Sequence, residues 1–379
     1  MPLVNARRLV VAFSGVLLSC MGFVGEELPG RDGGVDSGVL VEDAGHEDAG
    51  LADAGEVPDA GVEVDAGSPD AGAPDAGQPT RPVFVIGGQD MRRLVSFDGV
   101  TWFTDTWVAP NGEDNAFSGI AIGKRGIVMS GDPGVFRSTD GLAWTLVQAR
   151  PSRFAFHGST MAFADGQFVM LAQDLAWRSL DGITWESQQD TPGASGHWHA
   201  LAFGNGHWVG LGDGKRKISE NGFDWHDPTA FAMGLFEDVA FGAGRFVAVG
   251  KEAVDGGFGG WVSTSVDGQT WTHAATIPTP YDTGLSTVGF GNGVFVTSTC
   301  CSTLQSVDGV TWTQRTTNGS GGELAFAGDR FVTVGWRTEA SVLTPDAGSF
   351  VKTFTGDRPN PYDDAGIAPW FTAVGAGEL

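Results

Sequence analysis

The sequence contains very little cysteine. Only Cys20, Cys300 and Cys301 occur among 379 residues, and the last two are adjacent. A framework of long-range disulfides is therefore excluded. Two possibilities stay open for the adjacent pair: two free thiols, or a strained disulfide between Cys300 and Cys301, which an oxidising compartment would permit.

Positive charge is also scarce. Lys and Arg number 22 against 46 Asp and Glu, which gives a formal net charge of −24. This balance argues against nucleic acid as a partner, because a phosphate backbone requires a basic patch. The apolar segment Leu9–Leu18 follows Arg7 and Arg8 and is too short for an ordinary membrane-spanning helix. Its length and flanking charge predict a signal peptide over residues 1–19 and an exported protein.

The signal segment ends Leu17-Leu18-Ser19-Cys20, which resembles the lipobox of bacterial lipoproteins. The resemblance implies that the Cys20 thiol is acylated and becomes part of the first mature residue; plain secretion with an unmodified cysteine is the alternative. In that family an Asp after the cysteine retains the protein in the inner membrane, and Met21 stands there instead. We therefore expect a lipid-anchored outer-membrane protein, on the periplasmic or cell-surface face, that contacts the membrane through its lipid only.

An acidic segment with almost no aromatic residues occupies residues 20–81. Between Phe23 and Thr80, fifteen acidic residues stand against Arg31 alone, a net charge of −14. The tripeptide Asp-Ala-Gly recurs there, starting at Asp43, Asp48, Asp53, Asp59, Asp65, Asp70 and Asp75. Such a composition cannot bury a core, so it predicts a disordered linker. Its isolated carboxylates lack the clustered loop that calcium requires.

One short phrase recurs along the rest of the chain. Ser-x-Asp-Gly-x-x-Trp, or a degenerate form of it, begins at Ser96, Ser138, Ser179, Ser219, Ser265, Ser306 and Thr344. The gaps are 42, 41, 40, 46, 41 and 38 residues, and this period matches one four-stranded propeller blade. The sequence therefore predicts an all-β fold: a seven-bladed β-propeller over residues 82–379, with four antiparallel strands in each blade.

The two ends of this region complement each other. Val83–Gly87 matches the second strand of later repeats and has no first strand before it, whereas Phe371–Gly377 matches a first strand and its hairpin. We expect the C-terminal strand to complete the N-terminal blade, because this removes the open edges of the ring. The alternative, an open solenoid, leaves the complementary fragments unexplained.

Each residue type of the phrase has a mechanical role. Asp suits an acceptor for turn N–H groups, Gly supplies a positive φ, and Ser or Thr helps to fix the hairpin. The Trp offers a large apolar area, and we expect it to pack between neighbouring blades.

The phrase resembles the Asp-box, or BNR repeat, of sialidases and of many non-sialidase propellers. The latter include the photosystem II assembly factor type and bacterial glycosidase-like binding propellers. The resemblance extends over Pro82–Leu379, although the phrase is one residue shorter than the usual Ser-x-Asp-x-Gly-x-Thr-Trp. In that group the Asp-boxes lie on the blade rim and specify no activity.

A sialidase-like site requires three arginines around a carboxylate, a Tyr–Glu nucleophile pair and an acidic proton donor. The chain has two tyrosines, Tyr281 and Tyr362, and both fall in Pro-rich loops. Sialidases commonly have six blades, and this sequence predicts seven. Metalloprotease, esterase and phosphate-loop motifs are missing as well. The sequence therefore favours a protein that is not an enzyme, with no catalytic residues, no cofactor and no metal.

A propeller site is expected at a channel mouth, where the loops before the innermost strands gather. The repeat aligns seven residue pairs there, at 118–119, 159–160, 199–200, 237–238, 286–287, 322–323 and 370–371. The ligand-binding candidates are His199, Glu237, Asp238, Glu323 and Trp370, with His157, His197 and Trp198 in adjacent loops. A His with carboxylates could hold a divalent cation, and Trp could stack on a sugar. Ordinary solvated loop ends are the alternative, and we favour them over a metal.

These observations predict a monomeric, non-catalytic scaffold that binds protein or glycan at the cell envelope. Two other functions stay open: a carbohydrate-active hydrolase with an unrecognised site at the mouth, and an envelope complex assembly factor. The basic run Lys215–Lys217 suits a solvated hairpin tip or, alternatively, contact with an anionic partner.

Overall fold

The computed structural model describes residues 81–106, 116–132, 134–150, 156, 158–189, 197–213, 215–228, 235–254, 257–279, 284–299, 302–316, 322–335, 339–343, 351–355 and 371–379. The predicted signal peptide, the acidic linker up to Thr80, Cys20, and the pair Cys300 and Cys301 lie outside these residues. Regular structure in the described residues is entirely β-strand. They include no helix with the length and apolar character needed to cross a membrane.

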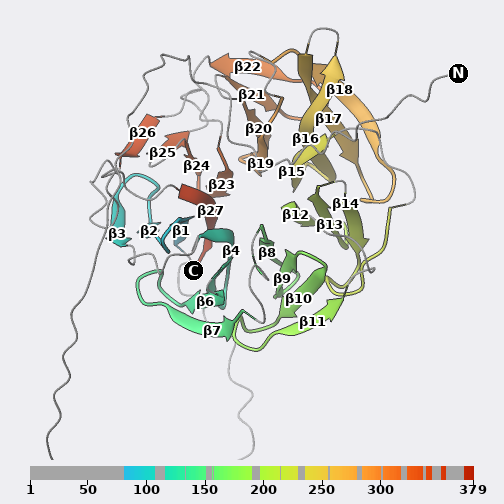
Figure 1. The fold of residues 1–379 in the computed structure, drawn as a ribbon. Helices are drawn as coiled ribbons and strands as arrows, with labels where there is room; N and C mark the ends of the chain where they lie inside the picture. The colour runs from blue at the N-terminus through green and yellow to red at the C-terminus, as the bar shows by residue number, and fades with distance from the viewer. Residues whose placement is uncertain are drawn as a thin grey trace, which may run out of the picture. The chain divides into compact units, whose positions relative to one another are not determined.

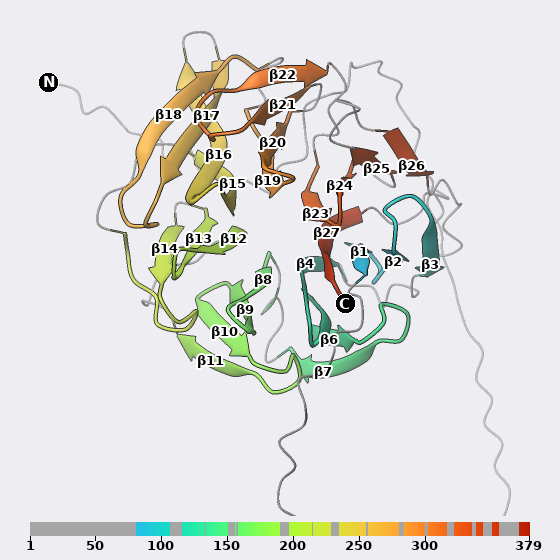
Figure 2. The same ribbon diagram turned by 180° about the vertical axis from the view of Figure 1, so that it is seen from behind.

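Seven antiparallel sheets stand around a central axis as the blades of a propeller (Figures 1 and 2). The predicted seven-bladed propeller is therefore confirmed. We number the blades 1 to 7 around the ring and give the strands of each from the axis outwards. Blades 1 and 2 are β27 (Phe371–Glu378), β1 (Pro82–Gly88), β2 (Arg93–Ser96) and β3 (Trp102–Thr106), then β4 (Phe117–Gly123), β5 (Gly126–Gly131), β6 (Gly134–Ser138) and β7 (Thr145–Ala149).

The remaining blades follow in chain order. Blades 3 and 4 are β8 (Thr160–Ala164), β9 (Gln167–Ala172), β10 (Leu175–Ser179) and β11 (Glu186–Gln189), then β12 (Trp198–Gly204), β13 (His207–Gly212) and β14 (Lys215–Ser219). Blades 5 to 7 are β15 (Leu235–Gly242), β16 (Arg245–Val254), β17 (Gly257–Ser265) and β18 (Thr272–Ile277), then β19 (Thr287–Gly291), β20 (Val294–Ser298), β21 (Thr303–Ser306) and β22 (Thr313–Thr316), and last β23 (Leu324–Ala327), β24 (Arg330–Val334), β25 (Glu339–Leu343) and β26 (Val351–Thr355).

The C-terminal strand closes the ring as the sequence predicts. β27 pairs with β1 in an antiparallel register that aligns Val374 with Ile86. Backbone hydrogen bonds between Arg81 and Leu379, at 3.0 and 3.1 Å, continue this pairing beyond the strands. Blade 1 therefore contains both ends of the propeller, and strand pairing as well as side-chain packing holds the ring shut.

Blade 4 departs from the prediction of four strands in every blade. Its described residues form three strands, and a single bridge between Ile218 and His226 takes the place of a fourth. Both backbone hydrogen bonds of this bridge are present, at 2.9 and 3.0 Å. In an antiparallel pair, hydrogen-bonded positions alternate, so the next residue that would hydrogen-bond to the β14 backbone is Pro228. Proline has no N–H to donate, so the pairing ends there.

Six described copies of the phrase form the same turn after the third strand of a blade; the seventh, residues 344–350, lies outside the described part. In the copy that starts at Ser306, the hydroxyl donates to Asp308 Oδ1 at 2.9 Å and accepts from Gly309 N at 2.8 Å. Asp308 Oδ1 accepts from the two amides after the glycine, both at 2.8 Å. The degenerate copy keeps this geometry, because Asn221 Oδ1 accepts the equivalent two amides at 2.9 Å.

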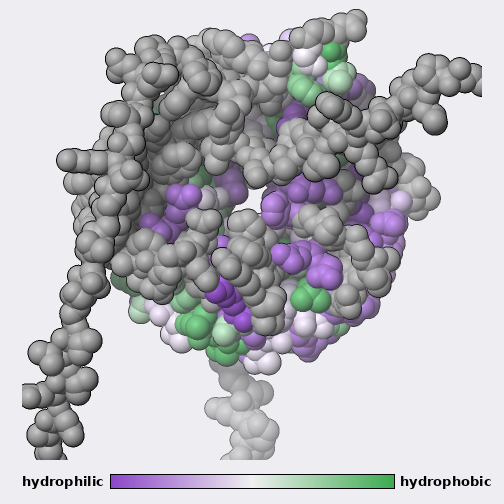
Figure 3. Space-filling view, in the orientation of Figure 1, coloured by the Kyte–Doolittle hydropathy of each residue, from purple (hydrophilic) through white to green (hydrophobic). Residues whose placement is uncertain are grey.

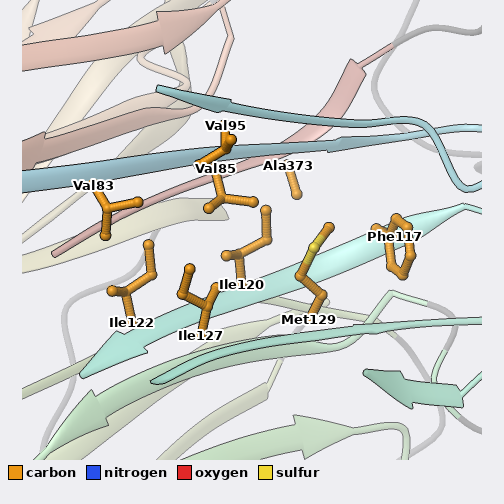
Figure 4. Close-up of a cluster of buried hydrophobic side chains, with 9 residues drawn as sticks. All are labelled: Val83, Val85, Val95, Phe117, Ile120, Ile122, Ile127, Met129 and Ala373. Carbon is orange, nitrogen blue, oxygen red and sulfur yellow. The ribbon is translucent and has the colours of Figure 1, made fainter. Parts of the chain in front are cut away.

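The six described turns dock blades 1 to 6 each on the preceding blade of the ring. The motif glycine has a positive φ and lies against a valine of the preceding blade: a Cβ on Gly309 would stand 2.5 Å from Val247 Cγ2. The motif Trp144 packs on a hydrophobic cluster that blades 1 and 2 share (Figure 4). That cluster consists of Val83, Val85, Val95, Phe117, Ile120, Ile122, Ile127, Met129 and Ala373. The packing of Trp between blades is thus confirmed, and the phrase specifies both the turn and the blade interface.

Candidate binding site at the channel mouth

Four inner strands begin with a β-bulge. Register shifts in β4, β12, β15 and β27 leave one residue of each strand without a directly paired neighbour, and these residues are Ser118, His199, Glu237 and Thr372. A bulge re-aims the side chain of the extra residue. Three of these four are among the aligned pairs at the channel mouth. We use the name mouth ring for Ser118, Ser159, His199, Glu237, Ser286, Gly322 and Thr372, together with the residue after each.

The last member of the ring corrects the sequence alignment. The pair 370–371 was expected in blade 1, but the bulge places Thr372 there, two residues further on, and Ala373 pairs with Gly87. The repeat normally carries an aromatic residue later in the inner strand, and this strand has Ala376 at that point, opposite Phe84. Without the aromatic residue, the pattern does not define the register. Trp370 lies outside the described residues.

Neutral hydroxyls form the arc of the ring from blade 1 to blade 3. Thr372 Oγ1 donates to the carbonyl of Phe117, and Ser118 Oγ donates to that of Phe156 at 3.1 Å. Ser118 Oγ also lies 3.0 Å from Ser159 Oγ. Each contact reaches from one blade to the next without introducing a charge.

Charged groups replace the hydroxyls in blades 4 and 5. His199 Nε2 lies 2.9 Å from Asp213 Oδ1, and His199 Nδ1 lies 3.3 Å from Glu237 Oε2. Lys251 Nζ is 3.0 Å from Glu237 Oε1, and the amide of His197 donates to Asp213 Oδ2 at 3.1 Å. We call these five residues the mouth network. The face drawn in Figure 3 is hollowed at its centre, and hydrophilic residues lie at the edge of the hollow.

The network stabilises the charged forms of His199 and Glu237. Burial alone would lower the pKa of His199, but the hydrogen bonds and negative charges of Glu237 and Asp213 raise that pKa above its ordinary value. Burial would raise the pKa of Glu237, and contacts with His199 and Lys251 bring it below its ordinary value instead. When His199 is protonated, its positive charge and that of Lys251 face the two carboxylates of Asp213 and Glu237.

Asp238 and Glu323 occupy equivalent ring positions in blades 5 and 7. Asp238 Oδ2 accepts from Val288 N at 2.7 Å, and Glu323 Oε2 accepts from Val374 N at 3.1 Å. Each carboxyl thus binds an amide on the inner strand of the next blade along the ring. Both candidates have structural contacts in addition to any contact they make with a ligand.

Burial is the main cause of the raised pKa values of Asp238 and Glu323. Loss of hydration raises the pKa of Asp238 to about 6, against the opposing effect of its hydrogen-bond donors. The same cause raises the pKa of Glu323 to about 8, and the charge of Asp238 adds to the effect. Water reaches the Glu323 side chain, although protein atoms surround it, so bulk-like solvation in the channel would moderate this rise.

The structure separates the other candidates from the network or leaves them undescribed. Trp198 is 4% exposed and packs with Leu171 and Ala176 of blade 3, so its ring is covered by protein. His157 lies outside the described residues. Lys217 belongs to β14 rather than to a hairpin tip; it is 7% exposed and lies 3.2 Å from Asp227.

Sequence reasoning missed Asp213 and Lys251. Each stands directly after a glycine of the second strand of its blade: Asp213 follows Gly212 at the end of β13, and Lys251 follows Gly250 within β16. Aligning the ends of the second strands in the same way as the starts of the first strands would have found them. No set of three or more His, Cys, Asp or Glu side chains in the described chain is arranged to hold a metal ion.

Comparisons with known proteins support the fold. No family model matches the chain, and no curated protein matches it. The solved structure of YCF48 bound to D1 peptide is similar with a TM-score of 0.50 and 17% identity, over 67% of this chain and 91% of that one. At this identity the likeness shows the propeller fold alone.

Two further solved structures are similar at lower scores. Apo AztD from Citrobacter koseri has a TM-score of 0.44 and 12% identity, over 79% of this chain and 98% of that one. YCF48 from Cyanidioschyzon merolae has a TM-score of 0.44 and 15% identity, over 68% of this chain and 94% of that one. The resemblance to the Asp-box group therefore depends on the repeated phrase alone.

Proposed function

We propose that this protein is a non-catalytic scaffold that binds a segment of another protein, or a glycan, at the mouth network of blades 4 and 5. The observation that carries the proposal is the uneven chemistry of the mouth ring. Charged side chains gather in blades 4, 5 and 7, whereas the other described ring positions carry hydroxyl or small residues. A mouth ring with a purely architectural role could carry the same residue types in all blades, as the described motif turns do. Local departure from a repeat supports a binding role.

Protein is the better supported of the two ligand classes. The mouth network offers paired charges at fixed distances, which suits the charged side chains and amides of an extended peptide. Trp198 is covered, so the aromatic platform expected for a sugar is missing at that position. The similar propeller YCF48 is described as bound to D1 peptide, and this supports a peptide ligand here by analogy only. The same analogy keeps an assembly-factor role among the proposals.

A hydrolase is the second candidate, and one observation favours it. Asp238 and Glu323 are two carboxyls whose pKa values are raised to different extents, about 6 and about 8, as an acid and base pair requires. However, Asp238 also accepts from Thr287 Oγ1 at 2.9 Å and from its neighbouring amide at 2.7 Å. Three donors on one carboxylate leave it little capacity as a base. We therefore place binding ahead of catalysis.

We propose further that the protein is a lipoprotein of the outer membrane, anchored at Cys20. Arg7, Arg8 and the apolar segment before the lipobox support this. Mass spectrometry of the mature N-terminal peptide should find a lipid on Cys20, and Cys20→Ala should move the protein from the membrane to the soluble fraction. Wild-type protein in the soluble fraction would overturn the anchor and leave the binding proposal intact.

The binding proposal is tested with a peptide library, a glycan array and a broad hydrolase screen in parallel on the mature protein. We expect a peptide or glycan hit without turnover. Glu237→Gln should weaken it by about tenfold or more, because a charge at the centre of the site is lost. Asp308→Asn, in a rim turn, is the matched control and should leave affinity unchanged. Turnover that disappears in Glu237→Gln or Asp238→Asn would overturn the proposal in favour of a hydrolase. A stable partner in a crosslinked pull-down would identify an assembly role.

A further inference from the structure

His199 lies between two carboxylates that belong to different blades. Its Nε2 faces Asp213 on the β13–β14 turn of blade 4, at 2.9 Å, and its Nδ1 faces Glu237 at the start of β15 in blade 5, at 3.3 Å. Both nitrogens are thus within ion-pair distance of a carboxylate oxygen. Its side chain is 23% exposed and that of Glu237 is 16% exposed, so water screens the second contact only partly.

This geometry requires a doubly protonated ring. A neutral imidazole has one N–H donor and one nitrogen lone pair, whereas an imidazolium has two donors. With one proton, one of the two carboxylates would face a lone pair at close range, which is repulsive. The shorter contact, to Asp213, is the one expected to keep the proton. The contact to Glu237 is therefore the one that depends on the second proton.

The lost contact is the one that crosses between the blades. Asp213 and His199 both belong to blade 4, and Glu237 and Lys251 both belong to blade 5. Each pair can persist without the other. Within the mouth network, the bond from His199 Nδ1 to Glu237 alone joins the two pairs across the blade boundary.

We propose that protonated His199 is a pH-sensitive clamp that joins blades 4 and 5 at the channel mouth, and that its deprotonation releases Glu237 and loosens this arc of the mouth. As regulation of ligand binding, the inference rests on the proposed function; as a property of the fold, it does not. Other titratable or charged groups face the His199 side chain from the elements packed around it. They are Asp238 on β15, Lys251 on β16, and His197 ahead of β12. On the opposite side β8 carries no charged residue.

The charges around the clamp give the direction of its effect. With His199 protonated, His199 and Lys251 carry two positive charges and Asp213 and Glu237 carry two negative ones. Deprotonation of His199 leaves one negative charge in excess. The pKa of His199 is raised by its two carboxylates, so its stabilising contribution is fully present below about pH 6.5 and is lost as pH rises through the folded-state pKa. Asp238 and Glu323 ionise in the same direction, at about 6 and about 8. The mouth therefore becomes more negative as pH rises, which weakens binding of an anionic ligand and strengthens that of a cationic one.

The test is an NMR titration of the histidine side chains in the ligand-free mature protein. Nitrogen-15 shifts of His199 should show both ring nitrogens protonated at pH 6, and its pKa should lie above the ordinary value. Glu237→Gln should lower that pKa, because the carboxylate charge is removed while the shape is kept. Asp213→Asn provides a second, independent variant in case the first does not fold. His207, whose Nδ1 lies 3.0 Å from the carbonyl of Asn205, is the matched control, and its titration should not change in either variant.

Hydrogen exchange reports the loosening itself. Between pH 6 and pH 8, after correction for intrinsic rates, residues 197–200 and 235–239 should exchange about fivefold faster, while the blade 1 to blade 3 arc stays unchanged. The same change should be absent in Glu237→Gln, because an amide can hydrogen-bond His199 Nδ1 whether or not that nitrogen is protonated. A His199 ring with one protonated nitrogen at pH 6, or equal protection at both pH values, would overturn the clamp. Both measurements are made without ligand, so a failed ligand screen would leave them unaffected.

Discussion

The six described motif turns occupy equivalent places in their blades, and so do the residues of the mouth ring, yet the turns repeat one set of contacts and the mouth ring varies its chemistry from blade to blade. Across five turns, the motif Ser Oγ accepts from the glycine amide at 2.8 Å each time. The mouth ring instead uses a hydroxyl in blade 2, an imidazole in blade 4 and a carboxylate in blade 5. Repetition marks what the architecture requires, and departure from it marks where the chain has been adapted to something else.

The largest effect should come from breaking the closure on which both regions depend. Deleting residues 371–379 removes the inner strand of blade 1 together with Ala373, which is 1% exposed, and uncovers the cluster residues that pack around it, such as Val85. We expect loss of cooperative unfolding, measured by calorimetry, because an open edge and an open interface appear together. Deleting Leu379 alone is the control; it removes two backbone hydrogen bonds to Arg81 and one side chain at the edge of the cluster, and keeps the inner strand. A cooperative transition in the longer deletion would show that the ring does not need its latch.

A smaller effect is expected at the rim from one added methyl group. Gly309→Ala combines a φ of 71° with a Cβ placed 2.5 Å from Val247 Cγ2, whereas Gly293→Ala has a φ of 76° and nothing within 4 Å. We expect losses in unfolding free energy of about 3 kcal/mol and about 1 kcal/mol respectively, since only the first adds overpacking to backbone strain. Urea denaturation measures both. Equal losses would mean that the glycine serves its turn and not the blade interface.

The mouth and the rim should respond to pH in opposite directions. Hydrogen bonds from the two following amides hold the pKa of Asp308 to about 2, below the unfolded value, so its stabilising contribution is present above about pH 4 and is lost as pH falls toward 2. Burial raises the pKa of Glu323 from 4.5 to about 8, so the unfolded state releases this proton first and stability falls as pH rises from about 4.5 to about 8.

Two conservative substitutions isolate the contributions of Asp308 and Glu323 to the pH dependence of stability. Asp308→Asn should flatten the acid limb of the stability curve and cost less than about 1 kcal/mol at pH 7, because Asn221 already makes the same turn and the site is exposed. Glu323→Gln should remove the decline in stability between about pH 4.5 and about pH 8 and leave the acid limb below pH 4 alone. Denaturation midpoints from pH 2 to pH 9 provide the comparison. If Glu323→Gln changed only the acid limb, the carboxyl would be ionised at neutral pH.

The features that repeat from blade to blade could be predicted from the sequence, whereas the features particular to one blade could not. Blade number, ring closure, the turn chemistry and the Trp packing all follow from seven spaced phrases and two complementary ends. In the described residues of blade 4, the single bridge in place of an outer strand is explained by one proline, Pro228, at a position where backbone pairing needs an N–H. The mouth network depended on Asp213 and Lys251, which come from second strands and reach the ring only through the fold. Trp198 was misplaced because a strand-start aromatic residue can turn into the neighbouring blade as readily as toward the channel.

The central claim is that the rim specifies the ring and the mouth specifies what the ring binds. The most direct measurement pairs unfolding free energy with ligand affinity for Gly309→Ala and Asp213→Asn. The rim variant should lose about 3 kcal/mol and keep its Kd within about twofold. The mouth variant, whose Asp213 side chain is 52% exposed, should lose less than about 1 kcal/mol and weaken binding about tenfold. An unchanged Kd in Asp213→Asn, or a rim variant that loses affinity while folded, would contradict this division of roles.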